Sequence, residues 1–209
     1  MKIPAKKKRT SGVLSDFAEG FRSLPVPAPK KGKEVTVMRN VVGSTQCRIL
    51  VIGPHPTHNE MSNGVPFSDN QSDYFYSSMR DSLGFPDDDF LLMPCSYFGA
   101  KASAASTKEV LPFLVRVVPT LPRLKHIVCA GMEPFSYVFA AGRKTHARTV
   151  IGNVMEMPFL HHKPVFVLPD PSRMFPTDPD SWKDMNFAND NREAFVKLLE
   201  KLATIFPKL

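Results

Sequence analysis

The sequence predicts an α/β protein, a three-layer α/β/α sandwich with a central parallel four-stranded sheet. Short apolar runs of strand length alternate along the chain with longer segments whose apolar residues recur at helical spacing, and that alternation is typical of a parallel sheet. Three of the four apolar runs also end in a proline-rich turn. Ligands bind at the carboxyl ends of the strands in such sheets, so these turns are the expected functional site.

Four apolar runs bounded by Gly or Pro predict the strands. They are continuous rather than alternating, as expected of strands buried on both faces. They span Cys47 to Ile52, Phe90 to Met93, His126 to Ala130, and Val165 to Leu168.

Helical periodicity predicts the segments between and after these strands. The expected helices run from Ser72 to Leu83, Thr107 to Val118, Phe135 to Ala141, and Asn189 to Ile205. Pro112 is expected near the first turn of its helix, or else at a kink. The last helix is amphipathic, with its apolar residues on one face.

The first 34 residues differ in composition from the remainder. They hold nine Lys/Arg, three Asp/Glu and several prolines, with little periodicity. We expect residues 1–34 to form a basic, Pro-rich, disordered arm and residues 35–209 to form one domain. Within the arm, only Val13 to Leu24 has a pattern that fits a helical turn or two.

The net charge of +7 is concentrated in two zones. One is the arm, and the other is residues 101–150, which carry eight Lys/Arg against two Asp/Glu. Two basic zones predict a polyanionic partner contacted by the arm and by one face of the domain. For the arm, the alternatives are a solubilising tail or a nuclear-type basic address.

Other classes of function have little support in the sequence. No apolar run reaches the roughly 20 residues of a membrane span, and the basic N-terminus is unlike a secretory signal. Cys47, Cys95 and Cys129 are odd in number and lack CxxC spacing, so we expect buried thiols in a reducing, intracellular compartment. We expect no cofactor and no metal. The pair His161-His162 is interpreted as part of an exposed hairpin, and the run 87–89 as a solvated loop.

Three segments at the strand ends resemble the uracil-DNA glycosylase superfamily, especially its four-cysteine branch. Ile52 to Phe67 (IGPHPTHNEMSNGVPF) matches a strand, a Gly-x-x-Pro turn and a Gly-x-Pro-Phe motif. Ile127 to Ala140 (IVCAGMEPFSYVFA) matches a strand, a glycine and a short helix. Val165 to Ser172 (VFVLPDPS) matches a strand followed by His-Pro-Ser. The resemblance covers roughly residues 47–175 and implies the same fold.

The resemblance also implies a set of catalytic groups, most of which are replaced. The family's water-positioning carboxylate or amide falls at His55, or at Pro54 if the four-cysteine branch is the guide. Its base-reading asparagine falls at Met93 or Pro94, neither of which can form two hydrogen bonds with a base edge. The iron–sulfur cysteines are absent as a set. Phe67 matches the family's aromatic residue, which stacks on the flipped base.

The histidine of the last motif is replaced by Asp170. The family's histidine supports negative charge on the departing uracil, whereas a carboxylate opposes it. At about 4 Å and an effective dielectric near 20, the opposition is on the order of 4 kcal/mol. Uracil excision by the usual groups is therefore not expected.

Several interpretations of the remaining residues stay open. His55 and Asp170 are expected in the same site, where they either fix the turns by hydrogen bonding, which we favour, or act as a general base and its orienting carboxylate. Phe67 either stacks on a base or only fills the site. His58 matches a histidine of some family members, or caps the next segment.

We expect a non-catalytic nucleic-acid-binding protein that combines a glycosylase-like fold with a basic arm. The combination resembles the RNA-binding glycosylase-fold proteins of nucleus-forming large phages. That resemblance implies single-stranded RNA, phage mRNA, as partner, in the bacterial host cytoplasm or the phage replication compartment. The alternative is a divergent DNA glycosylase or another enzyme that processes uracil or modified bases. The expected binding residues are Lys6, Lys7, Lys8, Arg9, Lys30, Lys31, Lys33, His58, Phe67, Lys101, Lys108, Arg143, Lys144, Arg148, Ser172 and Arg173.

Overall fold

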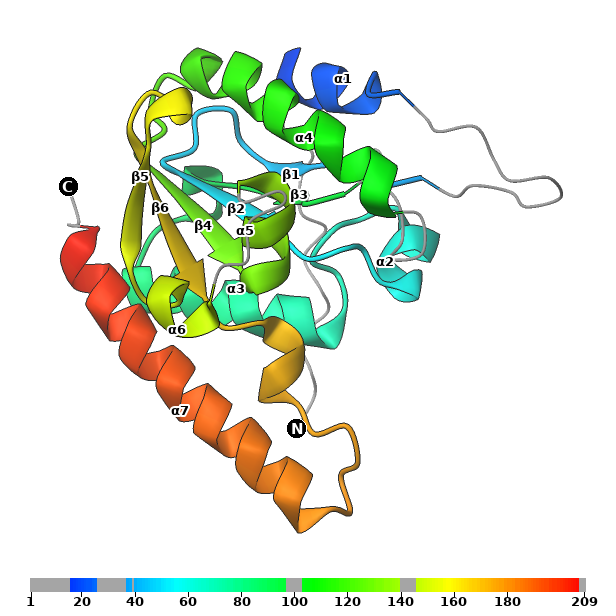
Figure 1. Ribbon diagram of the computed structural model, residues 1–209, viewed down its shortest axis with the longest axis vertical. Coiled ribbons are helices and arrows are strands. Elements are labelled where there is room, and N and C mark those ends of the chain that lie inside the picture. Colours follow the sequence, from blue (N-terminus) through cyan, green and yellow to red (C-terminus); the bar gives the residue numbers. More distant parts are fainter. Residues whose placement is uncertain (1–15, 26–36, 39, 97–102, 140–145, 207–209) are drawn as a thin grey trace, which may run out of the picture.

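The computed structural model describes residues 16–25, 37–38, 40–96, 103–139 and 146–206. Within these residues the sheet has six strands in the order β1-β3-β2-β4-β6-β5, with helices packed against it, and the predicted α/β class is confirmed (Figure 1). The four predicted strands are present and parallel, but the predicted strand number is wrong, because each edge carries an additional antiparallel strand.

The four predicted strands lie next to one another in the interior of this sheet. They are β3 (Phe90–Pro94), β2 (Ile49–Gly53), β4 (His126–Ala130) and β6 (Lys163–Leu168). Every neighbouring pair among them is parallel. Their carboxyl ends therefore meet at one edge of the sheet, the carboxyl edge, and their amino ends at the opposite edge, the amino edge.

The two strands that the sequence did not predict are short or half-exposed. β1 (Val42–Gly43) pairs antiparallel with β3, and two residues are too few to show a period. β5 (Val154–Met157) forms an antiparallel hairpin with β6 and alternates exposed and half-buried positions. Edge strands bury only part of their side chains, so they lack the continuous apolar run that marked the central strands.

Side chains of the central strands point alternately into two apolar cores, one on each face of the sheet. In β2, Leu50 and Ile52 belong to one core, and Ile49 and Val51 to the other. Helices α1, α4 and α5 cover the first core, and α3 and α7 cover the second. Figure 1 shows α1 and α4 together on one side of the sheet and the long α7 along the other. The protein thus has the three layers that the sequence predicts.

The helices agree with the sequence in type more than in length. Their bounds are α1 (Asp16–Arg22), α2 (His58–Asn63), α3 (Asn70–Leu83), α4 (Ser103–Val117), α5 (Met132–Val138), α6 (Ala147–Val150) and α7 (Trp182–Ile205). The described residues also form the 3-10 turns η1 (Asp87–Asp89), η3 (Val118–Thr120), η4 (Pro158–Leu160) and η5 (Pro171–Met174). Because α4 begins at Ser103, Pro112 lies in its interior and not in its first turn. No helix of the described residues has the length and apolar character needed to cross a membrane.

One helical segment of the predicted arm belongs to the domain instead. Helix α1 lies within the segment Val13 to Leu24, where a helical pattern was expected, but it is part of the packed core. Phe17 and Phe21 are about 1% exposed, and their rings contact Phe113 of α4. The apolar face of α1 buries enough surface to hold it on the domain. Leu24, just after α1, is buried in the same core, and residues 1–15 and 26–34 of the predicted arm lie outside the described residues.

The acidic run 87–89 is also not a uniformly solvated loop. Asp89 is 4% exposed, and its carboxylate contacts Arg48 at 2.5 Å and Arg123 at 3.5 Å. A buried carboxylate needs such partners, since an unpaired charge in the interior is strongly unfavourable. Asp89 therefore joins the turn before β3 to the segments before β2 and β4.

Candidate functional site

Three chemically reactive side chains converge at the carboxyl edge, directly after three neighbouring strands. His55 follows β2, Cys95 follows β3 and Glu133 follows β4. The His55 Nδ1 atom lies 3.3 Å from Glu133 Oε1 and 3.5 Å from Cys95 Sγ. From β2 the chain continues to β3 on one side of the sheet, and from β4 it continues to β6 on the other side. The cluster lies at this switch point between β2 and β4, and switch points are where ligands bind in α/β sheets.

Backbone hydrogen bonds hold this cluster in place. The Cys95 N–H donates to the Gly53 carbonyl at 2.8 Å, which fixes Cys95 beside the end of β2. The His55 N–H donates to Glu133 Oε2 at 3.3 Å, so the carboxylate contacts both the backbone and the ring of His55. His55 lies between Pro54 and Pro56, whose rings restrict the turn.

The environment sets the ionisation of the cluster. The hydrogen bond with His55 lowers the pKa of Glu133 below its usual value, against the opposing effect of burial. Burial, and after it the negative charge of Glu133, raise the pKa of the Cys95 thiol well above its usual value. Cys95 is thus a neutral thiol at neutral pH and has none of the thiolate character of a nucleophilic cysteine. As predicted, all three cysteines are buried and free.

Asp170 does not supply the carboxylate beside His55; Glu133 does. Asp170 is the N-cap of η5, where its Oδ1 accepts from the Ser172 N–H at 2.9 Å and from the Ser172 hydroxyl at 2.8 Å. An aspartate before a short helix takes this role readily, because its oxygen satisfies an otherwise unpaired backbone N–H. The predicted pairing of His55 with Asp170 is therefore replaced by two separate local arrangements.

Phe67 fills the site beside β2. Its side chain is 2% exposed and belongs to one of the two apolar cores. A Cβ on Gly53 would meet the Phe67 ring at 2.5 Å, so the ring rests directly on the end of β2. Phe67 also has φ of +59°, which is rare for an aromatic residue and is retained only where the surroundings enforce it. Of the two interpretations of Phe67, the geometry favours filling over stacking.

The segment after His55 begins with a helix cap that uses Thr57 rather than His58. The Thr57 hydroxyl accepts from the Glu60 N–H, and the Glu60 carboxylate accepts from the Thr57 N–H at 2.9 Å. This reciprocal capping box has the signature Thr-x-x-Glu, which is visible in the sequence. His58 is the first residue of α2 and is exposed.

The remaining predicted binding residues are less well placed. Ser172 and Arg173 are exposed on η5. Lys108 and Arg148 lie in α4 and α6, with side chains outside the description. The other predicted contacts lie outside the described residues: Lys6, Lys7, Lys8, Arg9, Lys30, Lys31, Lys33, Lys101, Arg143 and Lys144.

Cations that the sequence did not single out gather at the amino edge. Arg48 precedes β2, Arg123 and Lys125 precede β4, and Lys163 begins β6. They line a hollow of about 490 Å³ together with Pro122 and Leu124. Arg48 is held by Asp89, and Lys163 donates to the Leu124 carbonyl at 2.6 Å. Arg123 and Lys125 are exposed, and so the cationic groups that face solvent are mainly theirs.

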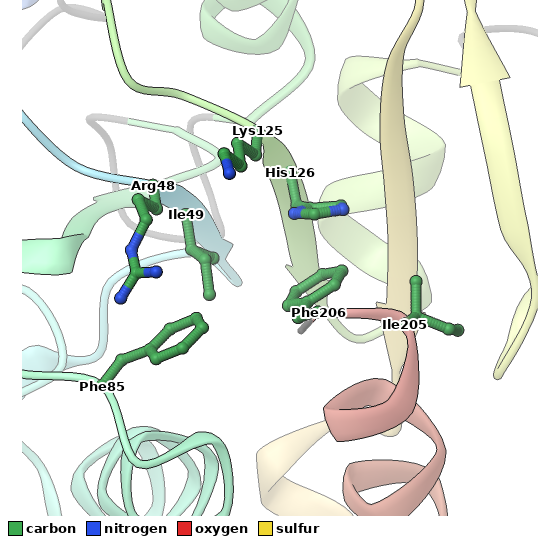
Figure 2. Close-up of a pocket in the computed structure, with 7 residues that line it drawn as sticks. All are labelled: Arg48, Ile49, Phe85, Lys125, His126, Ile205 and Phe206. Carbon is green, nitrogen blue, oxygen red and sulfur yellow. The ribbon is translucent and has the colours of Figure 1, made fainter. Parts of the chain in front are cut away.

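An aromatic hollow of about 270 Å³ adjoins this cationic one and shares Arg48 and Lys125 with it. Figure 2 shows the rings of Phe85 and Phe206 on either side of the space beneath Ile49. The Arg48 guanidinium lies over Phe85 at 3.9 Å, and His126 stacks on Phe206 with ring centroids 3.7 Å apart. The volume is slightly below the roughly 300–1,000 Å³ of typical ligand pockets.

The electrostatics of the amino edge are those of a positive surface. Burial, and after it the charges of Lys125 and Lys163, together lower the pKa of His126 to about 4. One part of the cationic cluster serves the fold, because α3 and α7 end nearby and cations stabilise helix carboxyl ends by about 0.3–1 kcal/mol each. The residues that line the cationic hollow are four cations and no carboxylate, and Asp89 neutralises Arg48 from beside it.

The sequence contains a simple signal both for the cations of the amino edge and for Glu133, none of which was predicted as a site residue. Three of the four central strands begin at or directly after a basic residue, and parallel strands bring such residues to one edge. Glu133 stands three residues after Ala130, the last residue of β4, so its side chain was bound to lie at the carboxyl edge. Neither signal shows which side chains these residues contact, because those contacts depend on the order of the strands in the sheet.

Fold and site together define an α/β protein of the doubly wound class, with a cluster of reactive side chains at the switch point of its sheet. The family model described as the uracil DNA glycosylase superfamily matches residues 41–203. The chain belongs to this superfamily, as its motifs predicted. A comparison with curated proteins found no match.

Proposed function

We propose that this protein binds single-stranded nucleic acid through the amino edge of its glycosylase-like domain and does not excise uracil. The observation that carries the proposal is the pair of adjoining hollows, one cationic and one aromatic, that share Arg48 and Lys125. Positive charge holds phosphates without sequence preference, and the exposed Arg123 and Lys125 supply it. Phe85 and Phe206 are 7% and 3% exposed, so they form the wall of the adjoining hollow rather than a free stacking platform.

The carboxyl edge supports the non-catalytic part of the proposal. Phe67 fills the space above Gly53, and Asp170 caps η5 where the family has its catalytic histidine. A carboxylate at that position opposes the charge that develops on a departing uracil. RNA is favoured over DNA, and phage mRNA in an infected bacterial cell over other RNA, because of the resemblance to the RNA-binding glycosylase-fold proteins of large phages.

The test is a titration of the full-length chain against single-stranded RNA, single-stranded DNA and duplex DNA at two salt concentrations. The key variant carries Arg123→Ala and Lys125→Ala, since both side chains are exposed and Arg48 still neutralises Asp89. The matched control carries Lys183→Ala and Lys197→Ala, two exposed lysines of α7.

We expect the wild type to bind single-stranded RNA most tightly. The key variant should bind more weakly, with the salt slope of log K reduced by about 1.4, because each phosphate contact on a single strand contributes about 0.7. The control should bind like the wild type. Removal of residues 1–15, which leaves the packed helix α1 in place, should also reduce the slope. Equal binding by the key variant and the control would exclude the amino edge as the interface.

The second candidate is a divergent glycosylase or another base-processing enzyme. The pair His55 and Glu133 favours it, because a carboxylate beside an imidazole is the arrangement of a general base and its orienting group. This candidate predicts release of a free base, or a strand break, from oligonucleotides that contain uracil or modified bases. Activity of this kind that His55→Ala abolishes would overturn the non-catalytic proposal.

A further inference from the structure

The side chains of His55, Cys95 and Glu133 converge on one point at the carboxyl edge. One ligand atom from each, namely an imidazole nitrogen, a thiol sulfur and a carboxylate oxygen, lies within 4.8 Å of the other two. His55 and Cys95 come from the turns after β2 and β3, and Glu133 from the first turn of α5, which follows β4. The cluster therefore depends on the strand order and is independent of the hollows at the amino edge.

The two contacts of His55 exclude a catalytic relay of the Cys–His–carboxylate type. In a relay the cysteine contacts one ring nitrogen and the carboxylate contacts the other, so that the ring passes a proton between them. Here Cys95 Sγ and Glu133 Oε1 both approach the same atom, Nδ1. Three donors that face a common point, rather than a chain, are the arrangement of a metal site.

The two separations from His55 Nδ1 agree with the edges of a metal tetrahedron better than with direct hydrogen bonds, while the sulfur and the carboxylate oxygen lie within 4.8 Å of each other. A zinc ion with ligand distances of about 2.0–2.1 Å to nitrogen, 2.3 Å to sulfur and 2.0–2.2 Å to oxygen separates N from O by about 3.3–3.5 Å and N from S by about 3.5–3.6 Å. The measured separations are 3.3 Å and 3.5 Å. Charge-assisted hydrogen bonds between nitrogen and a carboxylate are usually shorter, about 2.7–2.9 Å.

Burial leaves one side of this cluster accessible. The Cys95 side chain is fully buried and that of His55 is 4% exposed, whereas the Glu133 side chain is 35% exposed. A metal held by these three groups would be screened from solvent by the sheet and open toward Glu133. Three protein ligands with a fourth, open position are typical of exchangeable zinc sites and differ from the closed four-ligand sites of structural zinc.

Hydrogen bonds with the backbone also orient the members of this cluster, as they generally do for metal ligands. Glu133 Oε2 accepts from the His55 backbone N–H, which leaves Oε1 turned toward Nδ1. Cys95 is fixed by the bond from its N–H to the Gly53 carbonyl. These contacts set the positions of the donors before any ion arrives.

We propose that His55, Cys95 and Glu133 form a three-ligand site for a divalent transition metal, with Zn²⁺ as the preferred ion and the fourth position open to water. The mixed set of imidazole, thiolate and carboxylate selects Zn²⁺ over Mg²⁺ and Ca²⁺, which take oxygen ligands. Binding releases the Cys95 proton, because the thiolate is the ligand form.

The experiment is a titration of the chelator-treated, full-length protein with Co²⁺, followed by displacement with Zn²⁺. We expect one Co²⁺ per chain, the intense visible absorption of tetrahedral Co²⁺, and a near-ultraviolet thiolate-to-cobalt band that Zn²⁺ removes. Cys95→Ala should lose the thiolate band. The matched control is Cys47→Ala, which removes another fully buried thiol, one that lies outside the cluster.

Glu133→Gln is the second variant, chosen because its partly exposed side chain makes the substitution mild for the fold. It should weaken Co²⁺ binding at least tenfold while circular dichroism stays unchanged. A wild-type spectrum of the weak, octahedral kind, or a thiolate band that persists in Cys95→Ala, would overturn the proposal. Nucleic-acid binding at the amino edge is independent of either outcome.

Discussion

Two side chains of the carboxyl edge, Phe67 and Asp170, are engaged by the fold itself, whereas the amino edge is hollow and lined by four cations. At the carboxyl edge Phe67 rests on Gly53, and Asp170 is bonded to its own turn. At the amino edge Arg123 and Lys125 face solvent beside hollows of about 490 and 270 Å³. The strand order is therefore common to the fold, but the side chains at each edge decide what that edge can bind.

The comparison also separates two kinds of chemistry. Converging donors with fixed backbone support suit a small ion, and that is the pattern of His55, Cys95 and Glu133. Cations around an open hollow suit an extended polyanion, because each phosphate needs only a nearby positive charge. The predictions below test how independent the two edges are.

The largest expected effect is at the amino edge, for Asp89→Ala. This change leaves Arg48, whose side chain is 14% exposed, without its carboxylate, and loss of one partner of a buried ion pair costs about 3–5 kcal/mol. The free energy of unfolding, measured by denaturant titration, should fall by about 4 kcal/mol. Asp88→Ala is the control, because Asp88 is exposed and should change stability by less than about 0.5 kcal/mol. Similar stabilities for the two variants would show that Asp89 does not organise this edge.

The next effect is at the carboxyl edge, for Phe67→Ala. Truncating a buried aromatic ring costs about 3 kcal/mol or slightly more, through lost burial and the cavity left behind. Affinity for single-stranded nucleic acid should not change, because the ring is covered. The measurements are denaturant unfolding and the RNA titration. Weaker RNA binding by a folded Phe67→Ala protein would mean that Phe67 stacks on a base after all.

The smallest effect is a pH dependence that arises from His126. Its pKa of about 4 in the folded protein lies below the usual 6.5, so the unfolded chain takes up the proton first as the pH falls. Stability should be constant above pH 6.5 and should decrease between pH 6.5 and about 4, by about 2 kcal/mol because the ring is only partly buried.

The control for this pH dependence replaces His126 with an aromatic residue that does not titrate. His126→Phe keeps the stacking on Phe206 and removes the titrating group, so unfolding measured across this pH range should lose that decrease. His58→Gln, which changes an exposed histidine at the other edge, should retain it. A decrease of the same size in His126→Phe would assign the effect to other groups.

Much of the fold was predictable because its signals are local. An apolar run of four to six residues, stopped by Gly or Pro, predicted β2, β3, β4 and β6. The predicted start of α7 was seven residues too late, since Trp182 and Phe187 are exposed and give its first turns no apolar face. β1 carries only two residues and no pattern.

The sites were predictable only in part. The turns after the strands were identified, and His55 was named, but its partner was expected to be Asp170. The actual partner, Glu133, is 78 residues away, and the choice between the two depends on the distance of each turn from β2. The Asp170 carboxylate instead accepts from the Ser172 N–H, two residues away. Such a helix cap is local and does not depend on the rest of the fold.

By itself the sequence determined the superfamily, the α/β class and the edge where the strand-end turns gather, since spacing, periodicity and turn residues act over a few positions. The tertiary structure decided that Glu133 and Cys95 meet at one atom of His55, and that cations preceding separate strands surround one hollow. It also decided that Phe67 is covered. The physical reason is that contacts between distant segments depend on strand order and packing, which no short stretch of sequence contains.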